Sequence, residues 1–348
     1  MSNLRWKHRP DGSNWGDFGP DDQIGRLNLL TPQKIREGLA EVREARAFCL
    51  SLPLDFPGDN TLNPRRYPPK LRPTYRSGLP NMNYLMQRGD PQLTDVLNDD
   101  AVLLHLQYST QWDSLAHVGQ LFDADGDGVP EQVYYNGFRA HEHVVGPVRY
   151  EGQAVEPTHA EQTGAFALGI ETMATTCVQG RGVMIDLEAH LGRDFSRVGY
   201  ETLMRILEAD KVEVTEGDLV CLRTGFDRVL LDMNKRPTPQ GLECCAALDG
   251  RDQKLLDWIT ESGLTALISD NAAVEALPPG ECHDHQCSAL PLHAHCLFKL
   301  GVLLGEMWLL SDLADWLRAH HRYRFLLTAP PLRLPGAIGS PVTPVGTV

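Results

Sequence analysis

Hydrophobic and polar residues alternate with two different periods over the second half of the chain. Short apolar runs typical of buried strands occur at 182–187, 218–223, 264–269 and 323–327. Between them, apolar residues recur at helical spacing, from Gly169 onward, at 203–207 and at 255–259. This alternation predicts an α/β fold with a mixed central sheet flanked by helices.

The first 100 residues are less regular. Residues 1–30 have no sustained period and read as an irregular N-terminal extension, whose Trp6, Trp15 and Phe18 we expect to pack on the body or on a neighbouring subunit. Thr31 and Pro32 predict a helix start, with the helix running to about Arg46, and 48–54 alternates as a strand. Residues 55–91 contain seven prolines and predict a loop or lid rather than a regular element.

Polar groups concentrate in the stretch from Gln107 to His117. Val102, Leu104 and Leu106 alternate upstream and predict a half-buried strand that delivers this stretch to a cleft. On an extended chain residues two apart share a face, so four side chains could point the same way: Gln107, Ser109, Gln111 and Asp113. A bend near Leu115 could return His117 towards them. A carboxylate beside an imidazole can activate water, but Asp113 could equally cap a turn and His117 could be a core histidine.

A second polar segment follows at 282–296. It contains Cys282, His283, Asp284, His285 and Cys287, and then His293, His295 and Cys296. So many Cys and His residues suggest zinc, yet no pair has the two-residue gap of a zinc knuckle, and a loop of thiols and hydrogen-bonded imidazoles fits equally well. The alternation of Leu300, Val302 and Leu304 predicts a strand that ends at Glu306.

Two further groups of side chains are ambiguous. Residues 123–128 open like a calcium-binding loop, but Tyr134 stands where the bidentate Glu belongs, so a solvated turn is the preferred interpretation and calcium binding is left open. Arg65, Arg66, Arg72 and Arg76 could recognise a carboxylate substrate, or could be solvated and pair with the acidic surface.

The composition of the chain limits its possible partners and its expected location. A net charge of −14 over 348 residues disfavours nucleic acid and anionic membranes as partners. No apolar run reaches the roughly 20 residues that span a bilayer, and the N-terminus lacks a signal-peptide core, so we expect a cytoplasmic protein. The eight cysteines are expected to be reduced, including the adjacent Cys244 and Cys245. We expect one large domain, 1–348.

The central stretch resembles the signature of the cyclase family, which includes bacterial kynurenine formamidase and isatin hydrolase and reads His-x-Gly-Thr-His-x-Asp-x-Pro-x-His. Thr110, Asp113 and His117 match in register, whereas Gln107 and Gln111 stand where the family has two metal-binding histidines. Ser109 and Leu115 replace its glycine and proline. Further likeness at 28–32, 134–137, 301–306 and 329–341 extends the resemblance from residue 28 to 345.

The resemblance implies a cyclase-family (swivelling β/β/α-like) fold and hydrolysis of a cyclic amide, formamide or lactone by metal-activated water. His117 would then shuttle protons, and the metal ligands would be Gln107, Gln111, Asp113, His293 and Glu306. His295 is the alternative to His293 for the same position of the family pattern. The ion would be manganese, zinc or magnesium, and the glutamine oxygens favour the harder ions.

Two alternatives stay open. In the first, a metal-free lactone hydrolase or cyclase uses Asp113, His117 and Glu306 while Gln107 and Gln111 bind the substrate. In the second, the protein binds a small metabolite without catalysis. The resemblance also implies a small-molecule substrate and a homodimer or homotetramer. Each catalytic interpretation requires that the chain near residue 110 meets the chain near residue 300.

Overall fold

A nine-stranded mixed sheet forms the centre of the computed structural model, which describes residues 5–146, 163–282 and 286–348. The order of its strands is β1 (Ala47–Cys49), β21 (Val345–Thr347), β19 (Arg324–Thr328), β13 (Gln179–Asp186), β15 (Leu219–Arg223), β17 (Ala266–Ser269), β18 (Leu303–Glu306), β8 (Gln111–Asp113) and β20 (Gly339–Pro341). The four strands from β13 to β18 run parallel, and the outer pairs on both sides are antiparallel.

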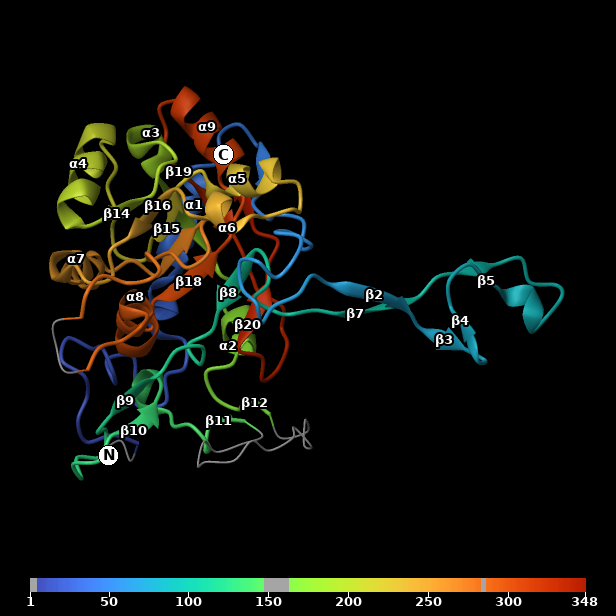
Figure 1. Ribbon diagram of the computed structural model, residues 1–348, viewed down its shortest axis with the longest axis horizontal. Coiled ribbons are helices and arrows are strands. Elements are labelled where there is room, and N and C mark those ends of the chain that lie inside the picture. The colour runs from blue at the N-terminus through green and yellow to red at the C-terminus, as the bar shows by residue number, and fades with distance from the viewer. Residues whose placement is uncertain (1–4, 147–162, 283–285) are drawn as a thin grey trace.

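Helices flank this sheet (Figure 1). They are α1 (Pro32–Ala40), α2 (Ile170–Thr175), α3 (Leu187–Leu191), α4 (Tyr200–Asp210), α5 (Phe226–Asp232), α6 (Pro239–Leu242), α7 (Gln253–Ser262), α8 (Pro291–His293) and α9 (Ser311–Ala319). Short helical turns cover Gly25–Leu29, Met86–Arg88 and Tyr135–Gly137, and Ala294–Leu300 is π-helical. Small two-stranded pairs join β9 (Gln120–Phe122) to β10 (Glu131–Val133), β11 (Val144–Val145) to β12 (Gly164–Ala165), and β14 (Ser196–Val198) to β16 (Ala246–Leu248). Over the described residues, no helix combines the length and apolarity that crossing a bilayer requires.

The four apolar runs of the sequence become strands of the central sheet, as predicted: three are the parallel β13, β15 and β17, and the run at 323–327 is β19, which is antiparallel to β13. Every residue of β15 and β17 is buried, because strands covered on both faces need apolar side chains on both. The helix at Thr31 is also confirmed, since the Thr31 side chain accepts a hydrogen bond from the Lys34 backbone. It ends at Ala40 rather than near Arg46.

The N-terminal extension packs on the body. Trp15 is fully buried and donates from its indole nitrogen to the Phe298 carbonyl at 2.7 Å, and its ring meets the Phe298 ring edge-on at 5.1 Å. Trp6 lies against Trp15. The expectation of an anchored N-terminal segment is therefore confirmed for these two tryptophans.

The prediction that 55–91 has no regular element is wrong. This stretch supplies β2 (Lys70–Pro73), β3 (Tyr75–Arg76), β4 (Leu79–Pro80) and β5 (Tyr84–Leu85). β2 pairs with β7 (Asp100–Leu103), β3 with β4, and β5 with β6 (Val96–Leu97). Together they form a ribbon that projects from the body, and we call residues 70–103 the arm (Figure 1).

The strand predicted from Val102, Leu104 and Leu106 is also corrected. It corresponds to β7, which ends at Leu103 and is exposed along its whole length. Alternation of apolar residues marked a strand correctly, but it did not show whether anything covers that strand.

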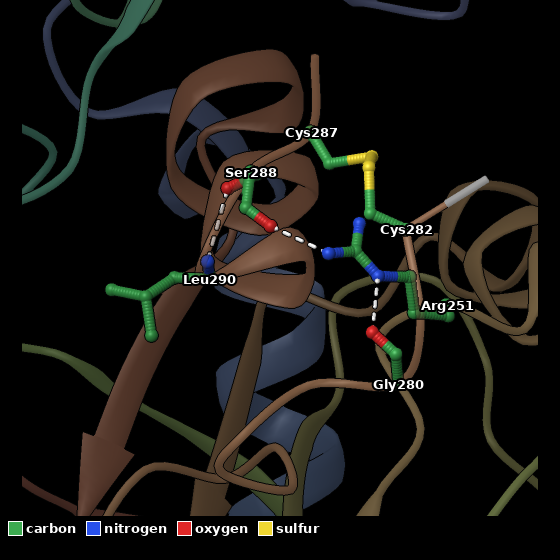
Figure 2. Close-up of a disulfide and its surroundings, with 6 residues drawn as sticks. All are labelled: Arg251, Gly280, Cys282, Cys287, Ser288 and Leu290. Atoms are coloured by element: carbon green, nitrogen blue, oxygen red, sulfur yellow. Dashed lines mark hydrogen bonds between the residues drawn. A yellow bond between two sulfur atoms is a disulfide. The ribbon is translucent and has the colours of Figure 1, made fainter. Parts of the chain in front are cut away.

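The expectation that all cysteines are reduced fails at Cys282 and Cys287, which form a disulfide (Figure 2). The Arg251 side chain lies beside it and donates to the Gly280 and Ser288 carbonyls. The six other cysteines, including Cys244 and Cys245, are free, as expected. His283, Asp284 and His285 of the predicted cluster lie outside the described residues.

Candidate active site

The site is built on β8, which lies between β18 and β20. In the β8–β18 register Gln111 lies opposite Glu306, and Asp113 lies opposite Leu304. Opposed residues of an antiparallel pair point to the same side, so the Gln111 amide donates to the Glu306 carboxylate at 2.6 Å. Asp113, two residues along, shares that side. The chain near 110 therefore meets the chain near 300, as the sequence analysis required.

The opposite face of β8 fixes the strand in place. Trp112 is fully buried and donates to the Ala329 carbonyl at 2.8 Å, and the Trp308 indole donates to the Gln111 carbonyl at 3.0 Å. The Thr110 hydroxyl donates to the Met307 carbonyl at 2.6 Å. Each of these groups has a hydrogen-bond partner. The contacts on the face of β8 opposite the site therefore fix the register that places Gln111 and Asp113.

His293 enters the site at the end of α8, where the π-helical turn begins. Its Nε2 lies 3.3 Å from Glu306 Oε1 and 4.0 Å from Asp113 Oδ2. Its Nδ1 lies 2.6 Å from Glu275 Oε1, and the same carboxylate accepts from the backbone nitrogens of Leu292 and His293. Glu275 therefore orients this imidazole. We did not predict Glu275 from the sequence, although a glutamate between Val274 and Ala276 is a signal for a buried, paired carboxylate.

His117 and Gln107 complete the cluster. His117 Nε2 lies 4.0 Å from Asp113 Oδ2, and His117 Nδ1 lies 3.2 Å from the Gln107 amide nitrogen. Gln107 also donates to Asp113 Oδ1. It thus presents its amide nitrogen to Asp113 and acts as a donor, whereas a metal ligand would present its oxygen.

Three buried carboxyl groups, Asp113, Glu275 and Glu306, surround the imidazoles. Burial and the neighbouring Asp113 charge raise the pKa of Glu306 to about 7. Burial lowers the pKa of His293, but hydrogen bonds to Glu275 and Glu306 outweigh it and raise that pKa to about 10. Burial lowers the pKa of His117. Three buried carboxyl groups thus surround one imidazole whose pKa is raised, and such an arrangement suits a cation.

Within this cluster, two buried side-chain oxygens have no hydrogen-bond partner: Asp113 Oδ2 and Gln111 Oε1. Asp113, His117 and His293 each present a ligand atom, and these atoms all lie within 4.8 Å of one another. The Asp113 carboxylate and the His293 imidazole are donors that zinc and manganese accept, the free Gln111 oxygen and the Glu306 carboxylate lie beside them, and His117 is close enough to act on a group bound there. The residues present therefore fit a divalent cation.

The predicted residues do not all converge in the expected roles. Asp113, Gln111, His293 and Glu306 meet as the resemblance implied, and His117 joins them. His295 points elsewhere, because its Nε2 lies 2.9 Å from the Thr260 hydroxyl. Of the two histidines that could match this position of the family pattern, His293 is therefore the one that lies in the site.

The acidic group Asp123, Asp125 and Asp127 also clusters. The Asp123 carboxylate accepts from the backbone nitrogens of Gly126, Asp127 and Gly128 at 2.7 to 3.1 Å. These bonds are those of an Asp-Gly turn, which was the preferred interpretation of the sequence.

A cavity of about 580 Å³ adjoins the cluster and reaches Gln107, Glu275 and Met307. Much of its remaining wall is apolar and includes Leu62, Phe195, Phe226, Leu242, Leu277 and Pro278. Of the four arginines considered from the sequence, Arg66 lines this cavity, and its guanidinium donates to the Gln107 carbonyl at 2.6 Å. The cavity therefore adjoins the cluster through Gln107 and Glu275, and Arg66 gives its wall a cationic group.

Comparison with known proteins identifies the family. The family model described as "Putative cyclase" matches residues 50–276. The chain belongs to the cyclase family. A crystal structure of a novel cyclase is 28% identical, with a TM-score of 0.70, and the match covers 100% of this chain and 99% of that chain. No curated protein sequence matches.

Other solved cyclase-fold structures are more distant. Isatin hydrolase A from Labrenzia aggregata, bound to benzyl benzoate, is 14% identical with a TM-score of 0.53, covering 90% of this chain and 97% of that chain. Isatin hydrolase A from Ralstonia solanacearum is 15% identical with a TM-score of 0.52, covering 91% and 97%. These likenesses confirm the cyclase-family fold with its mixed sheet flanked by helices.

Proposed function

We propose that this cyclase-family protein is a metal-dependent hydrolase that opens or cleaves a cyclic amide, formamide or lactone. Asp113 Oδ2 carries the proposal, because it is buried without a hydrogen-bond partner and lies 4.0 Å from the Nε2 atoms of both His117 and His293. Buried carboxylate oxygens are normally satisfied, so an unsatisfied one between two imidazoles suits a cation. The fold shared with isatin hydrolases supports this class of reaction.

Asp113 and His293 would hold the ion, with Gln111 and Glu306 beside them, and manganese, zinc and magnesium are the candidates. When bound, such an ion lowers the pKa of water and polarises a substrate carbonyl. Glu275 keeps the His293 ring directed at Asp113 by bonding its other nitrogen.

His117 is the proton carrier in this proposal. Its lowered pKa leaves the imidazole neutral near pH 7, so it can accept a proton from water and return it to the leaving nitrogen or oxygen. Gln107 holds the ring against Asp113. The apolar cavity wall and Arg66 favour a substrate with an apolar body and an anionic group.

The test combines metal analysis with turnover. Protein purified without chelator is assayed on a panel of cyclic amides, formamides and lactones, before and after metal removal and again after addition of Mn²⁺, Zn²⁺ or Mg²⁺. We expect turnover to disappear with the metal and to return with one of these ions. Asp113→Asn should lose both metal and turnover, while Asp123→Asn, in the acidic turn at residues 123–128, should keep both.

A metal-free mechanism is the second candidate, and one observation favours it. Gln107 and Gln111 already bond the Asp113 and Glu306 carboxylates, which leaves Asp113, His117 and Glu306 for acid and base chemistry. Turnover that survives complete metal removal would select this candidate. Absence of turnover on the whole panel, with metal or without, would favour a metabolite-binding role.

A further inference from the structure

Two free thiols meet at the wall of the cavity. The Cys245 thiol donates to the Cys244 sulfur at 3.5 Å, and Cys244 lines the cavity of about 580 Å³. On an extended chain the side chains of adjacent residues point to opposite faces. Here Cys245 has a φ of 69°, in the left-handed region, so the chain turns at this residue and the two sulfurs face each other. Non-glycine residues in such conformations concentrate at functional sites.

The two cysteines have different surroundings. Cys245 is 1% exposed and belongs to an apolar cluster with Phe226 and Met307, and its backbone nitrogen donates to the Arg193 carbonyl at 2.8 Å. Cys244 is half-buried and contributes to the cavity wall. A small molecule in the cavity therefore reaches Cys244, while Cys245 is held in the core behind it.

The neighbours of Cys244 favour its reactive form. The hydrogen bond from Cys245 lowers the pKa of Cys244, and the Arg193 charge acts in the same direction, although burial opposes both. Burial raises the pKa of Cys221 and of Cys296, which lie in the core. The thiolate is the nucleophilic form of cysteine. Of these thiols, Cys244 is therefore the one best suited to react.

We propose that Cys244 and Cys245 form a reversible redox pair, in which hydrogen peroxide that enters the cavity converts the two thiols into a disulfide. The Cys244 sulfur attacks one peroxide oxygen, the O–O bond breaks, and the departing hydroxide takes the Cys244 proton to become water. The Cys245 sulfur then attacks the resulting sulfenic acid. An S–S bond forms, the S–O bond breaks, and hydroxide leaves as water with the Cys245 proton. Two electrons thus pass from the sulfurs to peroxide, which becomes two waters.

The adjacency of the two residues makes this disulfide reversible. The Cα atoms of neighbouring residues lie about 3.8 Å apart across a trans peptide, below the roughly 4.4–6.8 Å usual for disulfides. A disulfide formed outside that range is more easily reduced, and labile disulfides are the regulatory ones rather than the structural ones. A dithiol reductant returns the pair to thiols by exchange. The pair therefore suits a reversible modification and not a permanent crosslink.

Oxidation would change the cavity beside the candidate site. Cys244 follows Glu243, which also lines the cavity, and Cys245 shares its apolar cluster with Met307, the residue after Glu306. Because Cys245 is fixed in the core, bond formation has to draw the Cys244 sulfur inward from the wall. The proposal rests on the geometry of the two thiols and does not depend on the metal or the reaction of the site.

The test reads the mass of one tryptic peptide. Cleavage after Lys235 and Arg251 releases residues 236–251, whose sulfur atoms belong to Cys244 and Cys245 alone. The folded protein is treated with hydrogen peroxide, and its remaining thiols are alkylated with iodoacetamide after unfolding. We expect this peptide to lose two hydrogens and to escape alkylation, and dithiothreitol should restore alkylation at both cysteines.

Variants separate the roles of the two thiols. Cys245→Ser should stop the reaction at the Cys244 sulfenic acid, which dimedone labels, and Cys244→Ser should leave the buried Cys245 unoxidised. Cys49→Ser with Cys177→Ser, which removes two exposed thiols, is the matched control and should leave disulfide formation unchanged.

The wild-type peptide keeps the test decisive if a variant fails to fold. A peptide that retains both thiols at a peroxide concentration that oxidises Cys49 or Cys177 would overturn the proposal. So would a peptide in which Cys244 gains oxygen atoms without forming a bond to Cys245.

Discussion

Two antiparallel strand pairs in this molecule have opposite environments. The β8–β18 pair is buried and sets Gln111 against Glu306, whereas the β2–β7 pair is exposed on both strands and sets Leu71 against Val102. In the first pair polar side chains lie where water is scarce, and in the second apolar side chains lie where water is plentiful. Both arrangements cost free energy: in the first pair a bound cation would offset the cost of burying polar groups, and in the second the apolar side chains stay exposed to water.

The largest expected effect is on turnover. His117→Ala should lower kcat/KM about 1,000-fold while the circular dichroism spectrum stays unchanged, because a positioned proton carrier contributes roughly 10²–10⁴. His141→Ala, an exposed histidine outside the cluster, is the control. The metal content of His117→Ala adds a second readout: retained metal identifies a proton carrier, and lost metal identifies a ligand. Near-normal kcat on a known substrate would remove His117 from the mechanism.

The second prediction compares the two strand pairs directly. Leu303→Ala on β18, at a fully buried position, should lower the free energy of unfolding by about 2–5 kcal/mol. Leu71→Ala on the arm, where the side chain is 72% exposed, should change it by less than about 0.5 kcal/mol. Denaturant titration measures both. Similar costs at the two positions would show that the arm has cover within its own chain.

The third prediction concerns Glu275. Glu275→Gln should weaken metal affinity by about 10–100-fold, since carboxylates that orient a ligating histidine contribute about that much. Asp123→Asn should leave affinity unchanged. Calorimetric titration with Mn²⁺ gives both values. If Glu275 served only the fold, its exchange would lower thermal stability and leave the affinity of the folded protein intact.

The smallest expected effect comes from restoring histidines. Gln107→His with Gln111→His should raise zinc affinity by about 10-fold, because imidazole nitrogen replaces a neutral amide at two positions beside Asp113. Competition with a chromogenic chelator reports the change. Unchanged affinity would mean that these side chains do not reach the ion.

Sequence reasoning predicted the parts of this molecule that depend on local pattern. Apolar runs predicted the strands β13, β15, β17 and β19, and Thr31 with Pro32 predicted the start of α1. The resemblance to the cyclase family implied that Asp113, His293 and Glu306 lie in one site, and in the structure they lie together. The outcomes at other positions depend on contacts between distant segments, which spacing does not encode. Glu275 acts through His293, and the exposed β7 has the same apolar alternation that a covered strand would have.

The disulfide illustrates the same limit. Chain length and cysteine count predicted the same reduced state for every cysteine. In the structure the Cα atoms of Cys282 and Cys287 lie 6.0 Å apart, within the range of a disulfide. The sequence also did not show which end of the Gln107 amide faces Asp113. An amide can present either its nitrogen or its oxygen, and the neighbouring groups decide which.

The central claim is that a divalent cation binds beside Asp113. The most direct measurement is anomalous diffraction from crystals grown with Mn²⁺ or Zn²⁺. The account predicts one strong peak per chain, within about 2.0–2.4 Å of Asp113 Oδ2 and in contact with His293. Crystals saturated with either metal that show no peak at this position, or a peak only at the Asp123 turn, would contradict it.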